Sequence, residues 1–204
     1  DGLADNVYMR EELKRYQNSN LNAYFSEFFD GTLQSESNTN NSYDQAGNPS
    51  SSSLISELSS GTSLLLYAGH ANEITLSTTN FNVNQVNQLT NNQQYFLGCV
   101  VGCSIGSHDE DYMGLSENLQ VTANKGSIAM FVSSILQSWT PPMYMQRALN
   151  TSIINATSVK TIGELFKEAV SIGNFRYSTD FWYFHILGDP CTKFILTLPE
   201  IRDI

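Results

Sequence analysis

The stretch LLLYAGHANE, residues 64–73, decides the fold, because an apolar run ends at a glycine and a histidine follows at once. A second stretch, YFLGCVVGCSIG at residues 95–106, has the same form and leads to a cysteine. Continuous apolar runs of this length are typical of strands that are buried on both faces of a parallel sheet. The two stretches therefore predict adjacent core strands, each followed by a residue with reactive chemistry.

Segments with helical and strand character alternate around these two stretches. We expect an α/β fold with a mostly parallel sheet flanked by helices on both faces. The polar stretch 34–53 has almost no large apolar side chain and predicts an exposed loop. Residues 6–29 predict a helix followed by an extended segment. Further helices are expected at 53–61, 115–126, 143–154 and 161–174, with a polar helix or turn at 82–91. Further strands are expected at 127–134 and 191–198.

Composition excludes two classes of protein. The 204 residues carry a formal net charge of −10 with only ten Lys and Arg, so a surface that follows nucleic-acid phosphates is not expected. There is no run of about 18 apolar residues, so no membrane span is expected. A chain of this length that is 41% hydrophobic can bury one core of ordinary size, which predicts a single domain.

A candidate catalytic pair follows the two apolar runs. Ligands of open parallel sheets bind beyond the carboxyl ends of the strands, so His70 and Cys103 should project into the same crevice. A thiol attacks as the thiolate, and a nearby imidazole can accept its proton and later protonate a leaving amine. Gly69, Ala71 and Gly102 flank the pair, where small residues let substrate approach and leave backbone N–H groups to hold an oxyanion.

The remaining cysteines and histidines have simpler interpretations. Cys99 lies inside the second apolar run, and Cys191 begins the last predicted strand, so both are expected to be buried. His185 stands in the aromatic run FWYFHILGD and is expected to be a core or groove histidine. His108 is expected in a solvated loop. An odd number of cysteines leaves at least one thiol without a partner in the chain.

An acidic cluster follows His108. Asp109, Glu110 and Asp111 could hold calcium, but they lack the regular spacing of oxygen ligands in a calcium loop. No metal site is therefore predicted, and a structural calcium ion is left open.

Four segments, taken in order, resemble motifs of the gingipain family of cysteine peptidases. YAGHANE resembles the family's Gly-His-Gly-Ser-Glu segment, and NQLTNNQQYFLGCVVG resembles its Leu-Thr-Asn turn, buried strand and nucleophile. LQSWTPPMYMQ resembles the Gln-Ser-Trp-Ala-Pro-Pro-Met segment, and FHILGDPCTKFIL the closing Phe-Gly-Asp-Pro-Ser strand. The thirty-three positions from His70 to Cys103 are similar to the spacing in arginine-specific members. The likeness runs from Asp1 to about Leu198.

The resemblance implies a caspase-like fold with Cys103 as nucleophile and His70 as general acid and base. It further implies an oxyanion hole formed by the backbone N–H groups of Cys103 and Ala71. The family has glycine where this chain has Ala71, and a methyl group fits there if φ is negative.

The resemblance also implies a pocket for a substrate arginine. Asp5 would bind the guanidinium, Trp139 and Met143 would close the pocket, and Gly69 would let the substrate approach. A carboxylate and an aromatic face are the groups that a guanidinium prefers.

By the same resemblance, residues 1–204 form the carboxyl-terminal part of the family's catalytic unit, and the carboxylate that orients the histidine lies upstream of them. We therefore expect a cysteine endopeptidase that cleaves proteins or peptides after arginine, is secreted or held at a bacterial cell surface, requires no cofactor, and pairs with the missing upstream part. Two alternatives remain. One is a peptidase or transpeptidase that processes the sorting signals of secreted proteins; the other is a peptidase-like binding module without activity.

Overall fold

The computed structural model describes residues 3–21, 23–29, 43–46, 49–138, 140–173 and 182–195. Its centre is a four-stranded sheet in the order β10-β8-β7-β3. Strands β3 (Leu64–Ala68), β7 (Phe96–Val101) and β8 (Ser127–Ser133) are parallel, and β10 (Phe184–Gly188) runs antiparallel to β8 at the edge. The prediction of an α/β fold with a mostly parallel sheet is therefore confirmed.

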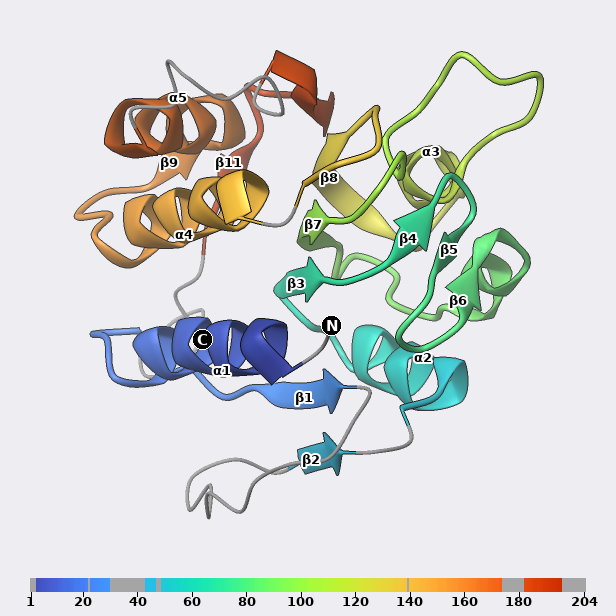
Figure 1. Cartoon of the computed structure of the whole chain (residues 1–204), viewed down its shortest axis with the longest axis horizontal. Coiled ribbons are helices and arrows are strands. Elements are labelled where there is room, and N and C mark those ends of the chain that lie inside the picture. The colour runs from blue at the N-terminus through green and yellow to red at the C-terminus, as the bar shows by residue number, and fades with distance from the viewer. Residues whose placement is uncertain are drawn as a thin grey trace, which may run out of the picture.

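Helices cover both faces of this sheet (Figure 1). One face packs against α1 (Leu3–Gln17), α4 (Thr140–Ile154) and α5 (Ile162–Gly173), and the other against α2 (Ser51–Ser59), α3 (Leu115–Val121) and the 3₁₀-helix η1 (Val83–Gln88).

The core consists of two clusters, one on each face of the sheet, because side chains alternate between the faces along the central strands. In β8, Phe131 joins the cluster under α1, α4 and α5, whereas Met130 and Val132 join the cluster under α2 and α3. Successive side chains of a strand point to opposite faces, which produces this division. All six residues of β7 are buried, as its continuous apolar sequence predicts.

Several short strands lie outside the central sheet; the extended segment expected at the end of 6–29 and the strand expected over 191–198 account for two of them, and the others were not expected. Strand β1 (Ser26–Phe29) pairs in parallel with β2 (Tyr43–Ala46), and β9 (Lys160–Thr161) pairs with β11 (Lys193–Phe194). A further small sheet consists of β4 (Ala71–Asn72), β5 (Thr75–Leu76) and β6 (Phe81–Asn82). Strands of two to four residues depend on backbone partners that are distant in the chain, which local composition does not reveal.

The prediction of a loop over 34–53 was wrong in part. Residues 43–46 form β2, and residues 51–53 form the first turn of α2, whose N-cap Ser50 accepts a hydrogen bond from the backbone N–H of Ser53. Polar side chains mislead here because the ladder and the cap use backbone and hydroxyl groups. Residues 34–42 and 47–48 lie outside the described residues.

The carboxyl-terminal strands also differ from expectation. The predicted strand 191–198 is reduced to β11 (Lys193–Phe194), and residues 196–198 lie outside the described part of the chain. Cys191, expected to be buried, is exposed in a turn, where its N–H donates to the Asp189 carboxylate over 2.8 Å. The edge strand β10 lies instead in the aromatic run before this turn. Within the described segments, no helix is long and apolar enough to cross a membrane.

Candidate active site

His70 and Cys103 occupy matching positions past the ends of two paired strands. Strands β3 and β7 are in parallel register with Ala68 opposite Val101, and the Gly69 N–H donates to the Val101 carbonyl over 3.0 Å. Each residue advances a parallel strand by the same distance. His70, two residues after Ala68, is therefore level with Cys103, two residues after Val101. The strand ends are therefore adjacent, as expected, and the meeting of the two side chains in one crevice stays a prediction.

Gly102 lets the two strand ends approach each other. A Cβ atom added at Gly102 would lie 2.7 Å from the Cβ of Ala71 and 3.2 Å from the carbonyl oxygen of Gly69. The first contact is shorter than real Cβ atoms show and the second is tight, so a larger residue would require the segment of His70 or that of Cys103 to shift. Glycine at position 102 therefore sets the distance between the two loops.

Tyr67 fixes the backbone at His70. Its hydroxyl donates to the His70 carbonyl over 2.5 Å and accepts from the Thr78 N–H over 3.2 Å. The ring is buried, and burial raises the pKa of Tyr67, so the hydroxyl remains a donor at physiological pH. Sequence analysis missed this role because Tyr67 stands in an apolar run and its partners lie beyond the next turn.

The backbone N–H of Ala71 is not used in the ladder of β4 and β5. Ala71 lies opposite Leu76 in the ladder of β4 and β5, and the Ser77 N–H donates to the His70 carbonyl over 3.0 Å. This bond makes Ala71 a non-hydrogen-bonded position, whose N–H points away from β5. Ala71 does not have a positive φ, so its methyl group is compatible with the loop.

Cys103 begins a sharp turn that is anchored to β8. Ser104 has φ 52°, a left-handed conformation, and its N–H donates to the Ile135 carbonyl over 2.9 Å. The N–H of Gly106 donates to the Ser133 carbonyl over the same distance. Such a turn directly after a strand presents a nucleophile at the sheet edge. The partly exposed Cys103 thiol faces the Gln137 carbonyl at 3.9 Å.

We expect Cys103, and not Cys99, to react with iodoacetamide in the folded protein at neutral pH. Cys99 is buried within β7, and burial raises its pKa to about 12, so almost no thiolate forms there. Peptide mapping after brief labelling at pH 7.5 measures both sites. A Cys99 adduct in the folded protein would contradict the assignment, whereas labelling of both after denaturation is the expected control.

The predicted arginine pocket is described in part. Met143 lies in the first turn of α4 and is half-buried against the core under α1, α4 and α5. The Tyr8 hydroxyl of α1 donates to the Met143 carbonyl, which joins the amino-terminal halves of the two helices. Asp5 lies one turn before Tyr8 on α1, but its side chain is outside the described part, as is all of Trp139. The helices that carry Asp5 and Met143 therefore contact each other.

The other two histidines lie near the same edge of the sheet. His108 is exposed, as expected, and its Nδ1 lies 3.0 Å from the Gly106 carbonyl. The half-buried ring of His185 on β10 meets the His108 ring edge-on, with centroids 5.4 Å apart. In the part of the chain that the structure describes, no group of three or more His, Cys, Asp or Glu could hold a metal ion.

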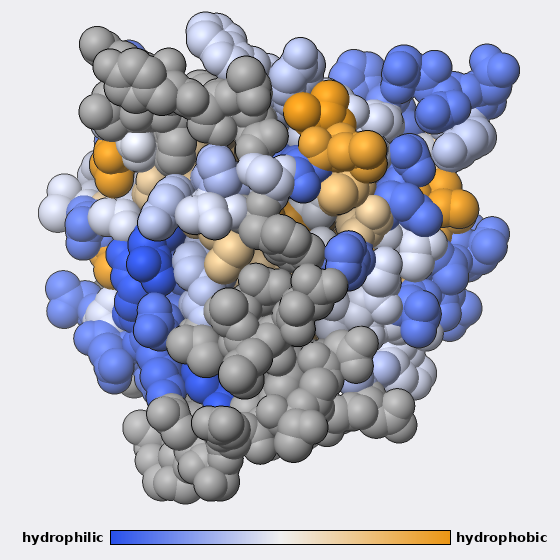
Figure 2. All heavy atoms as spheres, viewed as in Figure 1, coloured by the Kyte–Doolittle hydropathy of each residue, from blue (hydrophilic) through white to orange (hydrophobic). Residues whose placement is uncertain are grey.

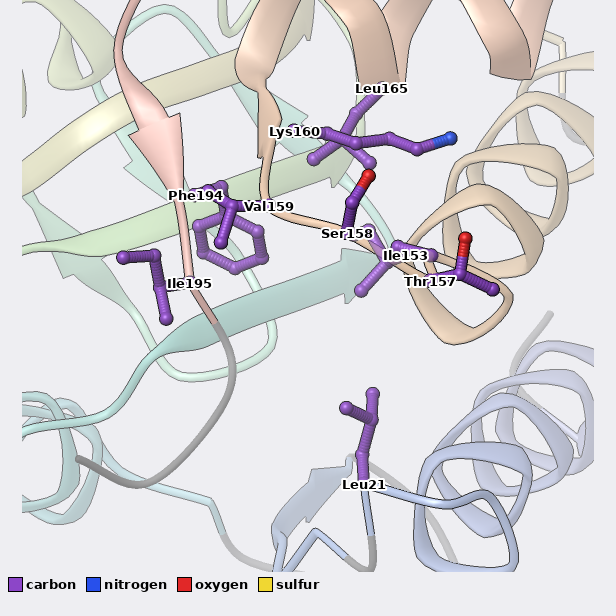
Figure 3. A pocket seen from close by; sticks show the side chains of 10 residues that line it. Leu21, Ile153, Thr157, Ser158, Val159, Lys160, Leu165, Phe194 and Ile195 are labelled. Carbon is purple, nitrogen blue, oxygen red and sulfur yellow. The ribbon is translucent and has the colours of Figure 1, made fainter. Parts of the chain in front are cut away.

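An apolar cavity of about 290 Å³ lies elsewhere (Figure 3). Leu21 borders it on one side, and Ile153, Val159, Phe194 and Ile195 lie on the other. Ile153 is ten residues beyond Met143 on α4, which is roughly 15 Å along a helix. This cavity is therefore separate from the strand ends that carry the candidate site.

Comparisons of the sequence with known proteins agree with this geometry. The model of peptidase family C25 matches residues 1–195. Gingipain R2 of Porphyromonas gingivalis is 33% identical over 104 residues, which cover 48% of this chain and 14% of that protein. Gingipain R1 of the same species is also 33% identical over 104 residues, with 48% and 10% covered. The chain thus matches only a small part of these relatives' length.

Comparisons of the structure lead to the same group of proteins. The complex of Porphyromonas gingivalis RgpB pro- and mature domains is similar with a TM-score of 0.67 and 25% identity, over 76% of this chain and 39% of that chain. The Arg-specific cysteine proteinase gingipain R is similar with a TM-score of 0.68 and 26% identity, over 76% and 38%. The chain therefore belongs to peptidase family C25, the gingipain-type cysteine peptidases of caspase-like fold.

Proposed function

We propose that the protein is a cysteine endopeptidase that cleaves peptide bonds after arginine, with Cys103 as nucleophile and His70 as general acid and base. The observation that carries the proposal is the equal position of these residues past the paired ends of β3 and β7. A thiol and an imidazole are the groups that nucleophilic acyl transfer requires, and a paired sheet edge holds them together.

The proposed reaction uses no cofactor. His70 takes the proton of the Cys103 thiol, and the thiolate attacks the scissile carbonyl carbon. The N–H groups of Ala71 and Cys103 stabilise the oxyanion, and its collapse breaks the C–N bond while His70 protonates the leaving amine. Water then attacks the thioester as His70 accepts its proton, and release of the acid restores the thiol.

Specificity for arginine is assigned to Asp5, Trp139 and Met143, with Gly69 at the pocket's entrance. The contact between Tyr8 and the Met143 carbonyl supports this assignment, because it holds α1 and α4 together where Asp5 and Met143 stand. One structurally similar protein is an Arg-specific cysteine proteinase, which agrees with the same choice. A carboxylate can bind a guanidinium through two parallel hydrogen bonds, whereas it meets lysine as a point charge.

Replacing Asp5 by asparagine tests the specificity. We expect Asp5→Asn to lower kcat/KM for peptidyl-arginine substrates by at least about 100-fold, because loss of one partner leaves the guanidinium charge unpaired in the pocket. The rate at which iodoacetamide labels Cys103 should change little. Parallel measurement of both quantities separates the pocket from the dyad.

Two results would change the proposal in different ways. Unaltered arginine cleavage in Asp5→Asn would remove the pocket and favour the enzyme that processes sorting signals, which has no evident need for this carboxylate. Failure of Cys103 to react with any thiol reagent in the folded protein would instead favour the inactive binding module.

We further propose that the protein acts outside the cytoplasm, secreted or at the surface of a bacterium, on protein or peptide substrates. The match to only 39% of one structural neighbour's chain supports association with a further part of the catalytic unit, which would supply the carboxylate that orients His70. Nucleic acid is not a proposed partner, since the net charge is −10. A structural calcium ion remains a proposal that calcium-dependent unfolding would test, although the described residues, Asp109 among them, form no group of three His, Cys, Asp or Glu that could hold it.

A further inference from the structure

The segment that follows β8, residues 134–138, bends at 134–135 and then passes beside the nucleophile. Exposure alternates along it: Ile135 and Gln137 are half-buried, whereas Leu136 and Ser138 are exposed. Both polar ends of the Gln137 side chain are buried, and 77% of Leu136 is exposed. An exposed leucine of this degree beside a reactive thiol is a candidate for contact with substrate.

Neighbouring apolar surface continues from Leu136. The Ser134 N–H donates to the Tyr183 carbonyl over 3.2 Å, so the start of β10 lies against this segment, and the Tyr183 side chain is 46% exposed. Figure 2 shows a hydrophobic group of atoms on the surface over the carboxyl end of β8. The surface patch formed by Leu136 and Tyr183 therefore adjoins the candidate site.

The geometry points to one occupant for this patch, and the inference rests on the proposed function. The Gln137 carbonyl lies 3.9 Å from the Cys103 sulfur, so the segment is close enough to the nucleophile for a peptide under attack to pair with it as an added strand. Successive side chains of an extended peptide point to opposite sides. If the arginine enters the pocket beside Met143, the residue before it faces Leu136.

We propose that Leu136, with Tyr183, binds an apolar side chain at the residue that immediately precedes the cleaved arginine. Side chains alternate along β8 and are taken to alternate along the segment after it. Residue 137 is then on the same side as Phe131, which packs in the core cluster that includes Met143. Residue 136 is on the opposite side. The arginine and its predecessor are thus recognised on the two sides of one segment. Net negative charge favours the arginine, and the patch favours an apolar neighbour.

The experiment compares two peptidyl-arginine substrates that differ only in leucine or serine before the arginine. We expect the wild-type protein to show a kcat/KM about tenfold higher for leucine, because the patch removes that side chain from water. Leu136→Ser should bring the ratio close to one while retaining activity on the serine substrate. Val121→Ser is the matched control, since Val121 is an exposed apolar residue on α3, and it should keep the wild-type ratio.

Each outcome separates the patch from the proposed function. Arginine cleavage with no leucine preference, or with a preference that survives Leu136→Ser, overturns the patch and leaves the peptidase proposal intact. Absence of all cleavage after arginine, with Cys103 unreactive toward leucyl- and seryl-arginyl chloromethyl ketones, overturns both. If the ketones label Cys103 but no substrate is cleaved, the preference for leucine over serine is measured from their labelling rates. Loss of that preference in Leu136→Ser supports the patch, and its persistence overturns the patch.

Discussion

Replacing Cys103 by alanine is expected to lower kcat/KM for cleavage after arginine by at least about 10⁴-fold, because the covalent route is lost with the thiol. His70 and the backbone N–H groups remain, so only weak stabilisation of attack by water is left. Cys103 lies past the end of β7 and is partly exposed, so its side chain contributes little to the core. Thermal unfolding of the variant should therefore match that of the wild type within a few degrees.

Cys191→Ala is the matched control for this experiment. Cys191 is also a thiol and is exposed, but it lies in the turn before β11, away from the paired ends of β3 and β7. Its replacement should leave kcat/KM within about twofold of the wild-type value, as surface changes remote from function normally do. Substantial cleavage by Cys103→Ala would remove the nucleophile assignment, whatever the behaviour of Cys191→Ala.

The features predicted best from the sequence are those set by local pattern. The apolar run of β7 is buried throughout, whereas β3, at the edge of the described sheet, is buried only at Tyr67 and partly exposed elsewhere; their shared apolar composition nevertheless indicated the parallel pairing. Glycines at 69 and 102 mark where these runs end, and the residues that follow had to meet at one edge. The position of His70 relative to Cys103 thus follows from pattern and from the general rule for open sheets.

The features missed depend on contacts between distant segments. Strand β10 was overlooked because an aromatic run with an internal histidine has no clear period, and its pairing with β8 defines it. The sequence indicates that Tyr67 is a core residue, but it does not reveal that the Tyr67 hydroxyl donates to the His70 carbonyl. Leu136 lies between a strand and a helix, where the sequence does not reveal that its side chain is exposed beside the thiol.

The buried carboxylate of Glu12 joins α1 to α4. Its side chain is fully buried and accepts hydrogen bonds from Arg15 Nη1 and Arg147 Nε over 2.6 Å and from Asn150 Nδ2 over 2.8 Å. Asn150 in turn accepts from the Tyr16 hydroxyl over 2.9 Å. Loss of one member of a buried charged network leaves the remaining groups without partners, which costs more than an exposed ion pair contributes.

Glu12→Ala is therefore expected to lower the free energy of unfolding by about 2–4 kcal/mol, because the Asn150 amide and two guanidinium groups lose their common acceptor. The arginine side chains are 34% and 39% exposed and can recover some hydration, which keeps the loss below that for a wholly buried pair. Urea unfolding followed by circular dichroism measures the change, with the slope of the transition as a check on two-state behaviour.

Glu11→Ala provides a matched comparison, since Glu11 also meets Arg147, at 3.2 Å, but its side chain is 62% exposed. An exposed pair contributes about 1 kcal/mol or less, so this variant should remain close to the wild type. Equal stability of the two variants would show that the network around Glu12 does not hold α1 on α4. If Glu12→Ala is less stable than Glu11→Ala, its rate of cleavage after arginine should fall more than its rate of Cys103 labelling. The reason is that the position of Asp5 depends on α1, whereas the position of Cys103 depends on the end of β7.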